Sequence, residues 1–373
     1  MRFTINRRAL GKGLSIIQKS SLKQSFSPIL VYTLLELNQK GLSLTTTNGP
    51  VSINHTIPNI INDEIVISNI EEGSILIKSD LLLEIVRKLD GMNTVTFEVL
   101  DDTLITIESE SFSANIKGAS AEEFPDINLD EDGDLLILDA RKFVSVIDQT
   151  SFAASTKDKP PLNAINFASE GGVLNITATD TTKLARRTIQ ITTSTNSIFN
   201  IAAKTAETIA RMCEDADELK IYINNNRALF VFDNTKVNTQ LILADYPNTK
   251  SIKIQNAQYR LEVNAQQLIT ALERVSSLSS ASDRAVKLSL RNGDVRVSTR
   301  DEGLGSAKER ISPVYYESEP LEVSCGFLNL SNSLKALRCE DVVLEFVGEM
   351  RPFKVSNPKD DSISILITPV RLI

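Results

Sequence analysis

The chain has 373 residues, of which 42% are hydrophobic and 24% charged, and its formal net charge is −8 at pH 7. These proportions are ordinary for a globular protein, and the negative sum argues against a simple nucleic-acid coat protein. No run of about 18 apolar residues occurs, which excludes a transmembrane helix, and the first residues lack the apolar stretch of a signal peptide. The length favours two or three domains.

The opening of the chain recurs twice. Its three copies are FTINRRAL at 3–10, LILDARKF at 136–143 and RLEVNAQQL at 260–268. In each copy an extended segment leads to Asn6, Asp139 or Asn264, whose side-chain oxygen can accept from the free N–H groups of a first helical turn. The copies are spaced by about the size of a domain, far above the period of a solenoid repeat. We therefore predict three like domains, at residues 1–130, 131–255 and 256–373.

Each third repeats one order of elements. A strand and an amphipathic helix are followed by two or three strands in which apolar and polar residues alternate. In the first third, the helix from Arg7 carries Leu10, Leu14 and Ile17 on one face. The six predicted helices are 7–20, 80–90, 140–151, 204–215, 265–280 and 328–341. The predicted fold class is α+β, with two helices packed on antiparallel sheets in each domain.

Residues for catalysis are scarce. The single histidine, His55, stands in an alternating segment typical of a strand, and one histidine without local company cannot complete a nucleophilic triad. The Gly-Lys-Gly at 11–13 lacks the spacing of a phosphate-binding loop and falls inside a predicted helix. The cysteines, which lack metal-site spacing and are expected to be reduced core thiols of a cytosolic protein, are Cys213, Cys325 and Cys339.

Two segments allow both a structural and a functional interpretation. The acidic run 128–139 offers oxygen ligands around Gly133 in the manner of a calcium loop, but its flanks predict a proline turn and a strand, which favours an interdomain linker. The segment 177–187 is either a strand end with Asp180 in the turn or a loop that places cations beside Leu184.

Charge is distributed unevenly along the chain. The six predicted helices together carry +3, so that the remaining residues carry −11. Helices that face inward on a body with acidic outer strands would attract a polyanion locally and repel it elsewhere. Charged helix faces are commonly just solvated, so this signal is weak by itself.

Several short motifs are distributed from end to end of the chain. Each is common by itself, but their order and spacing together indicate one protein family. They are MRFTINR at the start, PIL at 28–30, LSLTTTN at 42–48, FPD at 124–126, DYPN at 245–248, LKALRCE at 334–340 and TPVRL at 368–372. On these motifs the chain resembles the bacterial DNA polymerase III beta subunit family, the replicative sliding clamps.

The resemblance implies three like domains of the DNA-clamp fold and a head-to-tail homodimer that closes a ring around double-stranded DNA. It implies a processivity factor that slides without sequence specificity, has no catalytic residues, metal or cofactor, and works in the cytoplasm. The implied partners are the replicative DNA polymerase catalytic subunit, the clamp loader and repair proteins with clamp-binding motifs. A size estimate agrees: three domains about 36 Å across leave a gap of about 5 Å between them, whereas six leave about 36 Å, enough for a duplex.

Within that family, basic side chains of the lining helices contact phosphates without reading bases. The expected DNA-facing residues are Arg7, Arg8, Lys12, Lys23, Arg87, Lys88, Arg141, Lys142 and Lys204. The expected contacts of the ring joint are Phe112 in the first domain and Leu278 in the third.

The family also has a hydrophobic peptide-binding pocket between its second and third domains. Residue by residue, the resemblance places it at Leu162, Thr179, Thr181, Lys183, Leu184, Pro247, Ile252, Met350, Leu366, Ile367, Pro369, Val370, Arg371 and Leu372. The chain departs from the family pattern at Thr181 for Gly, Thr182 for His, Ser251 for Arg, Pro160 and Pro161 for paired tyrosines, and an additional Ile373. The apolar floor is retained, and the departures bear on the pocket's shape and peptide preference.

A function from another class is the alternative. A ligand-binding or hydrolytic enzyme could be built on the same repeated α+β domains, with the acidic run 128–139 holding a metal. Retention on closed circular DNA distinguishes a clamp from such an enzyme.

Overall fold

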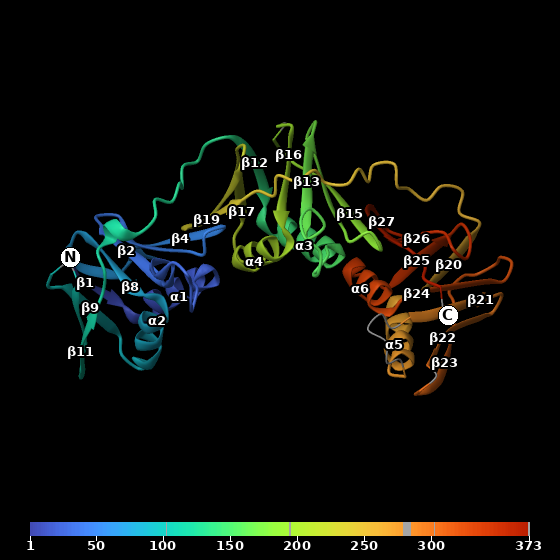
Figure 1. Ribbon diagram of the computed structural model, residues 1–373, viewed down its shortest axis with the longest axis horizontal. Coiled ribbons are helices and arrows are strands. Elements are labelled where there is room, and N and C mark those ends of the chain that lie inside the picture. The colour runs from blue at the N-terminus through green and yellow to red at the C-terminus, as the bar shows by residue number, and fades with distance from the viewer. Residues whose placement is uncertain (102, 194, 279–284, 302, 372–373) are drawn as a thin grey trace. The chain divides into compact units, whose positions relative to one another are not determined.

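The computed structural model describes residues 1–101, 103–193, 195–278, 285–301 and 303–371 (Figure 1). These residues form six α-helices on antiparallel sheets, as the α+β prediction requires. By their contacts they divide into two compact units, residues 1–141 with 208–241 and residues 142–207 with 242–373. None of the described helices has both the length and the apolar character needed to span a membrane.

The first unit contains a five-stranded sheet in the order β11-β10-β9-β1-β7. Its strands are β1 (Arg2–Asn6), β7 (Ile67–Glu71), β9 (Thr94–Val99), β10 (Leu104–Ser109) and β11 (Phe112–Lys117). Phe3 on β1 stacks on Phe97 of β9 with ring centroids 5.0 Å apart, and both side chains are buried. Strand β11 lies at one edge and has a single neighbour among the described strands.

An eight-stranded sheet in the same unit joins strands from two thirds of the chain, in the order β12-β17-β18-β19-β4-β3-β2-β8. The strands from the first third are β2 (Tyr32–Asn38), β3 (Gly41–Thr47), β4 (Val51–Pro58) and β8 (Gly73–Lys78). Those from the central third are β12 (Asp134–Asp139), β17 (Glu218–Ile223), β18 (Arg227–Phe232) and β19 (Thr235–Gln240). The antiparallel pairing of β19 with β4 makes one continuous sheet.

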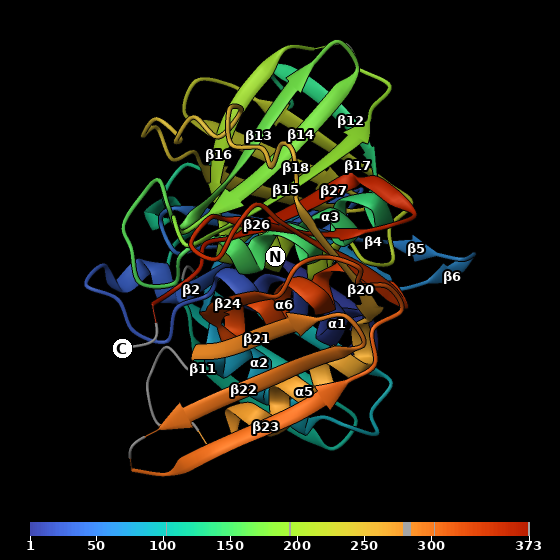
Figure 2. The same ribbon diagram turned by 90° about the vertical axis from the view of Figure 1, so that its right-hand side faces the viewer.

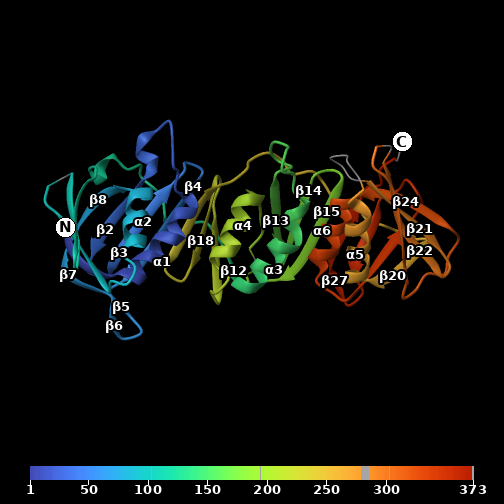
Figure 3. The ribbon, with the colours of Figure 1, turned by 90° about the horizontal axis from the view of Figure 1, so that it is seen from below.

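Two helices lie side by side in this unit, α1 (Arg7–Ile17) and α2 (Ser79–Lys88) (Figure 3). Helix α1 begins where predicted, because the Asn6 side chain accepts from the backbone N–H groups of Arg8 and Ala9 at 2.9 and 3.1 Å. A Cβ on Gly13 would lie 2.9 Å from the Ile57 side chain, so glycine there lets α1 approach β4 closely. The Gly-Lys-Gly segment is thus a packing feature of a helix.

A short hairpin, β5 (Ile60–Ile61) and β6 (Glu64–Ile65), completes the strands of the first unit. Figure 2 shows it standing clear of the unit's sheets. Ile60 and Ile65 pair across it and are 60% and 74% exposed.

The acidic run 128–139 is tied to this unit's sheet by cations. Arg227 on β18 pairs with Asp132 and donates to the carbonyl of Asn128 at 3.0 Å, and Lys236 on β19 lies 3.0 Å from Glu131. A cluster of three or more His, Cys, Asp or Glu side chains suited to a metal is not found in the described part of the chain. These ion pairs hold the first half of the run against the sheet, and Asp134–Asp139 form strand β12.

His55 lies in β4 at the junction between strands of the first and central thirds. Its Nδ1 is 2.9 Å from the Thr235 hydroxyl, and burial lowers its pKa to about 4. The folded state therefore favours the neutral imidazole. Its contribution to stability is complete above the pKa of the unfolded state, about 6.5, and is lost as the pH falls toward 4.

We expect the free energy of unfolding of this unit to fall by about 2 kcal/mol from pH 7 to pH 5 through His55 alone. Denaturant titrations at both pH values measure it. A His55→Gln variant, which cannot titrate there, should lose this component; an equal pH dependence in the variant would contradict the assignment.

The second unit contains another eight-stranded sheet, in the order β16-β13-β14-β15-β27-β26-β25-β20. Its central-third strands are β13 (Ala164–Glu170), β14 (Val173–Thr179), β15 (Lys183–Gln190) and β16 (Ser197–Ala202). Its last-third strands are β20 (Tyr259–Asn264), β25 (Asp341–Phe346), β26 (Phe353–Asn357) and β27 (Asp360–Ile367). The junction is the antiparallel pair β15–β27.

A four-stranded sheet, β23-β22-β21-β24, completes the second unit's strands. They are β21 (Ala285–Arg291), β22 (Asp294–Asp301), β23 (Gly305–Ile311) and β24 (Leu321–Gly326). Helices α5 (Ala265–Ser276) and α6 (Phe327–Leu337) lie side by side against it (Figures 2 and 3). As predicted, Asn264 caps α5 by accepting from the Gln267 N–H at 3.0 Å.

The central third supplies α3 (Ala140–Thr150) and α4 (Ala203–Met212). Phe143 of α3 stacks toward Phe167, which stacks on Phe199 at 4.9 Å. Short 3-10 turns lie at Gln18–Ser20, Pro28–Val31, Ala121–Glu123 and Ser151–Ala153. All three cysteines are free, and Cys213 and Cys325 are buried, as expected of reduced core thiols.

Candidate functional site

The pairing of β15 with both β14 and β27 brings together three residues of the predicted peptide site. Thr179 pairs with Leu184, and Leu184 pairs with Leu366, so the three side chains lie in one row on one face of the sheet. Leu184 and Leu366 are each 5% exposed. This row, the floor row, is an apolar surface built from strands of two different thirds of the chain.

Two predicted residues lie on the opposite face of the same sheet. Lys183 pairs with Ile367, one position along from the floor row, and Ile367 pairs with Phe353. Side chains alternate between faces along a strand, so these three point away from the floor row. Ile367 is fully buried and belongs to the core.

The turn between β14 and β15 is fixed by Asp180. Its Oδ1 accepts from the N–H groups of Thr182 and Lys183 at 2.9 and 3.0 Å, and its Oδ2 pairs with the Lys183 ammonium. Burial favours a raised pKa for Asp180, but hydrogen bonds from Lys183 and Thr182 outweigh it and lower that pKa. The structure thus supports the turn interpretation of Asp180, and the charge of Lys183 is engaged within the turn.

Thr181 keeps a backbone conformation that favours glycine, with φ of 75°. A β-branched residue in the left-handed region is strained. The turn therefore holds Thr181 in a conformation that glycine adopts without strain.

We expect Thr181→Gly to stabilise the protein by about 1 kcal/mol, since relief of the strain exceeds the greater freedom of glycine in the unfolded chain. The midpoint of thermal unfolding measures this. Thr182→Gly is the matched control and should lower the midpoint, because Thr182 has an ordinary φ and its hydroxyl hydrogen-bonds to Asp180 at 2.8 Å. A lower midpoint for Thr181→Gly would contradict the strain.

Thr182 also connects the turn to the last third of the chain. Its carbonyl accepts from the Thr368 N–H at 2.8 Å, and its hydroxyl accepts from the Asn329 amide of α6 at 3.3 Å. The residue that replaces the family's histidine is therefore a contact between the two thirds.

The remaining predicted site residues come from other segments of the chain and differ in exposure. Pro247 is exposed, Ile252 is 46% and Met350 51% exposed, and Leu162 is half-buried. In the C-terminal segment Pro369 is buried, Val370 is half-buried and Arg371 is exposed, while Leu372 lies outside the described residues. The Pro160–Pro161 bond, in place of the paired tyrosines, is cis.

Four residues near the floor row were missed by sequence reasoning. Arg186 and Asn200 hold the segment 242–252, which contains Tyr246 and Thr249. The amide of Asn200 among the apolar residues 198–202 is the available sequence signal, because a buried amide needs hydrogen-bond partners.

Most of the predicted DNA-facing cations are exposed. These are Arg8, Lys12, Lys23, Arg87, Lys88, Arg141, Lys142 and Lys204. Arg7 differs: its side chain is 15% exposed and lies 2.7 Å from Asp90, so its charge is largely compensated within the chain. Lys88 also has a partner, Glu84 at 2.6 Å, but both side chains are exposed and such pairs are weak.

The two residues predicted for the ring joint lie near sheet edges. Phe112 is half-buried and begins the edge strand β11. Leu278 is half-buried and follows α5, which packs against the edge strand β23.

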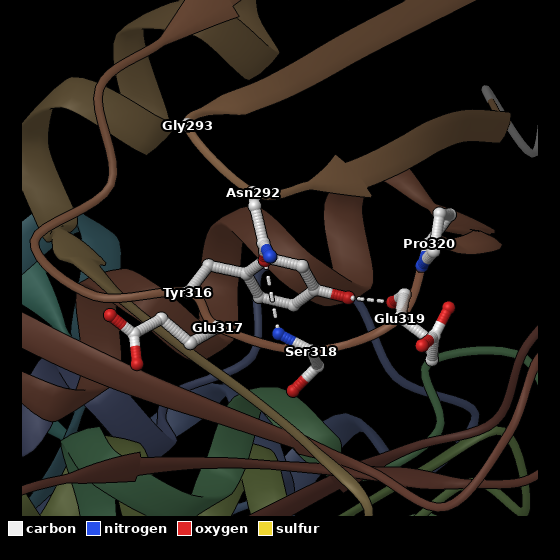
Figure 4. Close-up of a pocket in the computed structure, with 7 residues that line it drawn as sticks. All are labelled: Asn292, Gly293, Tyr316, Glu317, Ser318, Glu319 and Pro320. Atoms are coloured by element: carbon white, nitrogen blue, oxygen red, sulfur yellow. Dashed lines mark hydrogen bonds between the residues drawn. The ribbon is translucent and has the colours of Figure 1, made fainter.

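A surface pocket elsewhere in the second unit contains none of the predicted residues. It is lined by Asn292, Gly293, Tyr316, Glu317, Ser318, Glu319 and Pro320 (Figure 4). The Tyr316 hydroxyl donates to the Glu319 carbonyl at 2.7 Å, and Asn292 accepts from the Ser318 N–H at 3.1 Å. The first bond lies within the loop and the second holds the loop against the β21–β22 hairpin, so both have a structural role.

Three family models, one for each domain of a single kind of protein, together match nearly the whole chain. The DNA polymerase III beta subunit N-terminal domain matches residues 1–130, its central domain residues 137–248 and its C-terminal domain residues 250–371. The beta sliding clamp of Bacillus subtilis is 29% identical over 377 residues, and that of Staphylococcus epidermidis 28% over 376, with all of this chain and at least 99% of each relative covered.

Solved structures agree. The Bacillus subtilis DNA polymerase sliding clamp has a TM-score of 0.96 at 28% identity, and the Streptococcus pneumoniae DNA polymerase III beta chain has 0.94 at 26%, each covering 100% of both chains. The chain therefore belongs to the DNA polymerase III beta subunit family, the sliding clamps that act as non-catalytic processivity factors in DNA replication.

Proposed function

We propose that two copies of this clamp associate head to tail into a closed ring of six domains around duplex DNA, with domains at residues 1–130, 131–255 and 256–373. The observation that carries this proposal concerns two of the sheet edges, one in each compact unit. Strand β11 and strand β23 each end a sheet and have one neighbour among the described strands. Unpaired edges are templates for another strand, so an intact protein usually covers them.

Apolar side chains lie on or near both edges. Strand β11 presents half-buried Phe112, Ala114 and Ile116 on one side, and β23 lies beside α5, which Leu278 follows. In the proposed joint, β11 of one copy lies against β23 of the second copy, which is a heterologous contact. Such contacts form a closed ring only when the rotation between neighbouring copies suits the number of subunits. Two such joints complete a dimeric ring.

We propose that the exposed cations of the helices contact DNA phosphates. Such contacts carry no sequence information and weaken with salt, so they allow sliding. Topology rather than affinity then retains the ring, and the side chains only need to keep the duplex centred. We place this activity in the cytoplasm.

We propose that the floor row, together with Pro247, Ile252, Met350 and the C-terminal segment, forms a hydrophobic pocket for short peptides. Its partners are the replicative polymerase catalytic subunit, the clamp loader and repair proteins with clamp-binding motifs. Support comes from the apolar side chains of Leu184 and Leu366, which pair across two strands, and from the exposure of the apolar Ile252 and Met350. Apolar contact of this kind supplies affinity, and the polar turn at Asp180 limits the orientation of a peptide.

Mass in solution tests the dimer. One chain has a mass of 41.1 kDa, and the proposal requires twice that value in light scattering coupled to size exclusion. A mass of one chain at all accessible concentrations would contradict the ring.

A further inference from the structure

The linker, residues 242–252, contains no strand or helix, yet it includes two of the proposed pocket residues, Pro247 and Ile252. Figure 1 shows the path that leads from it to β20. Most of its side chains are exposed, but Thr249 is only 8% exposed. Buried polar groups in a loop require partners, and here they come from the sheet beneath.

Arg186 on β15 holds the linker at one point. Its Nη2 donates to the Thr249 carbonyl at 2.6 Å and to the Thr249 hydroxyl at 3.2 Å. The same carbonyl accepts from the Ile252 N–H at 3.0 Å, so Arg186 fixes the turn that presents Ile252. A charged donor makes this bond stronger than a neutral one.

Asn200 on β16 holds the linker at a second point. Its amide donates to the carbonyls of Ile242 and Ala244 at 3.2 and 3.0 Å, and its backbone carbonyl accepts from the Ile242 N–H at 2.9 Å. The Asn166 amide donates to its side-chain oxygen at 2.9 Å and fixes its orientation. Asn200 is 8% exposed, so these bonds are shielded from water.

Tyr246 contributes a third, apolar anchor between those two points. Tyr246 is half-buried, its hydroxyl oxygen is buried, and burial raises its pKa to about 12. Burial of this side chain holds the middle of the linker against the protein.

The strand register relates the positions of these anchoring residues to the proposed peptide site. Asn200 pairs with Asn166, Asn166 with Thr177, and Thr177 with Arg186, so the four side chains form one row across four strands. This anchor row and the floor row share strands β14 and β15, and on both strands the two rows lie on the same face, two residues or about 7 Å apart. A segment fixed to the anchor row at Arg186 therefore passes beside the floor row.

We propose that Arg186 and Asn200 are positioning residues that fix the linker as one wall of the peptide site. The inference rests on the proposed peptide-binding function of the floor row.

The test compares Arg186→Met, Arg186→Lys, Asn200→Ala and Lys359→Met in the full-length protein. The probe is a fluorescein-labelled peptide from the clamp-binding segment of the organism's replicative polymerase, followed by anisotropy. Hydrogen exchange is measured for the linker and, as an internal reference, for strand β25. Lys359→Met removes an exposed cation from the turn between β26 and β27, at the end of β27 away from Leu366, and so controls for the loss of a charge outside the proposed site.

We expect Arg186→Met and Asn200→Ala to weaken peptide binding about 10-fold and to speed exchange in the linker but not in β25. Arg186→Lys, which retains one charged donor, should restore binding to within about 3-fold of the parent, and Lys359→Met should leave binding unchanged. Unchanged binding in both anchor variants, or weaker binding with unchanged linker exchange, would overturn the inference.

Failure of the underlying function gives a different pattern. Leu184→Asp alters the floor row without touching an anchor. If Leu184→Asp abolished peptide binding while the anchor variants bound the peptide normally, the pocket assignment would be supported and the anchoring inference would be refuted. If Leu184→Asp also kept the peptide, the site itself would be misplaced.

Discussion

Leu184→Asp is expected to reduce peptide affinity at least about 100-fold, because it removes apolar area from the floor row and buries a carboxylate under the bound peptide. Leu184 is 5% exposed and pairs with Thr179 and Leu366, so the change falls at the centre of the proposed site. Arg371→Ala tests the C-terminal side of the same site and should also weaken binding. Anisotropy with the labelled polymerase peptide measures both.

A matched control for Leu184→Asp exists on the same sheet. Ile198 on β16 is 75% exposed, and Ile198→Asp makes the same chemical change away from the floor row. It should leave peptide binding unchanged, and the solution mass of all these variants should match that of the parent. Undiminished polymerase binding by Leu184→Asp would refute the pocket assignment.

Phe112→Asp is expected to convert the dimer to single chains. Loss of an apolar anchor costs about 2 kcal/mol at each joint, and a ring has two joints, so dimerisation weakens about 1000-fold. Leu278→Asp should act equally from the other side of the joint. Light scattering over a range of concentrations measures both effects.

Mixing the two variants gives the sharper result. The Phe112→Asp chain keeps an intact β23 edge and the Leu278→Asp chain an intact β11 edge, so a mixed dimer has one unaltered joint and one doubly altered joint. The mixture should regain the mass of two chains while remaining an open ring. A mixture that stays monomeric like each variant alone would contradict a heterologous joint.

Local features were predictable because their causes are local. Asn6 and Asn264 cap their helices as expected, since a cap is decided by one side chain and the next turn. The helix from Arg7 buries Leu10, Leu14 and Ile17, as its 3.6-residue period indicates. The α+β class and the family followed from such repeated local signals, whereas the domain bounds and the site residues remain predictions.

Pairings between distant strands were not predictable. Strand β19 joins β4 and β15 joins β27, and no local pattern encodes which strand a given edge will select. The division of predicted site residues followed from this register: Leu184 and Leu366 came to one face, and Ile367 to the other. The anchoring of the linker depends on the same register, because Arg186 and Asn200 lie in one row only once four strands are paired.

The central claim is that retention on DNA is topological. The most direct measurement loads the protein onto nicked circular DNA with its clamp loader, isolates the complex and then cuts the circle once with a restriction enzyme. The protein should remain on the uncut circle and leave the linear product, while the open mixed dimer should be retained on neither. Equal retention on circular and linear DNA would contradict the ring.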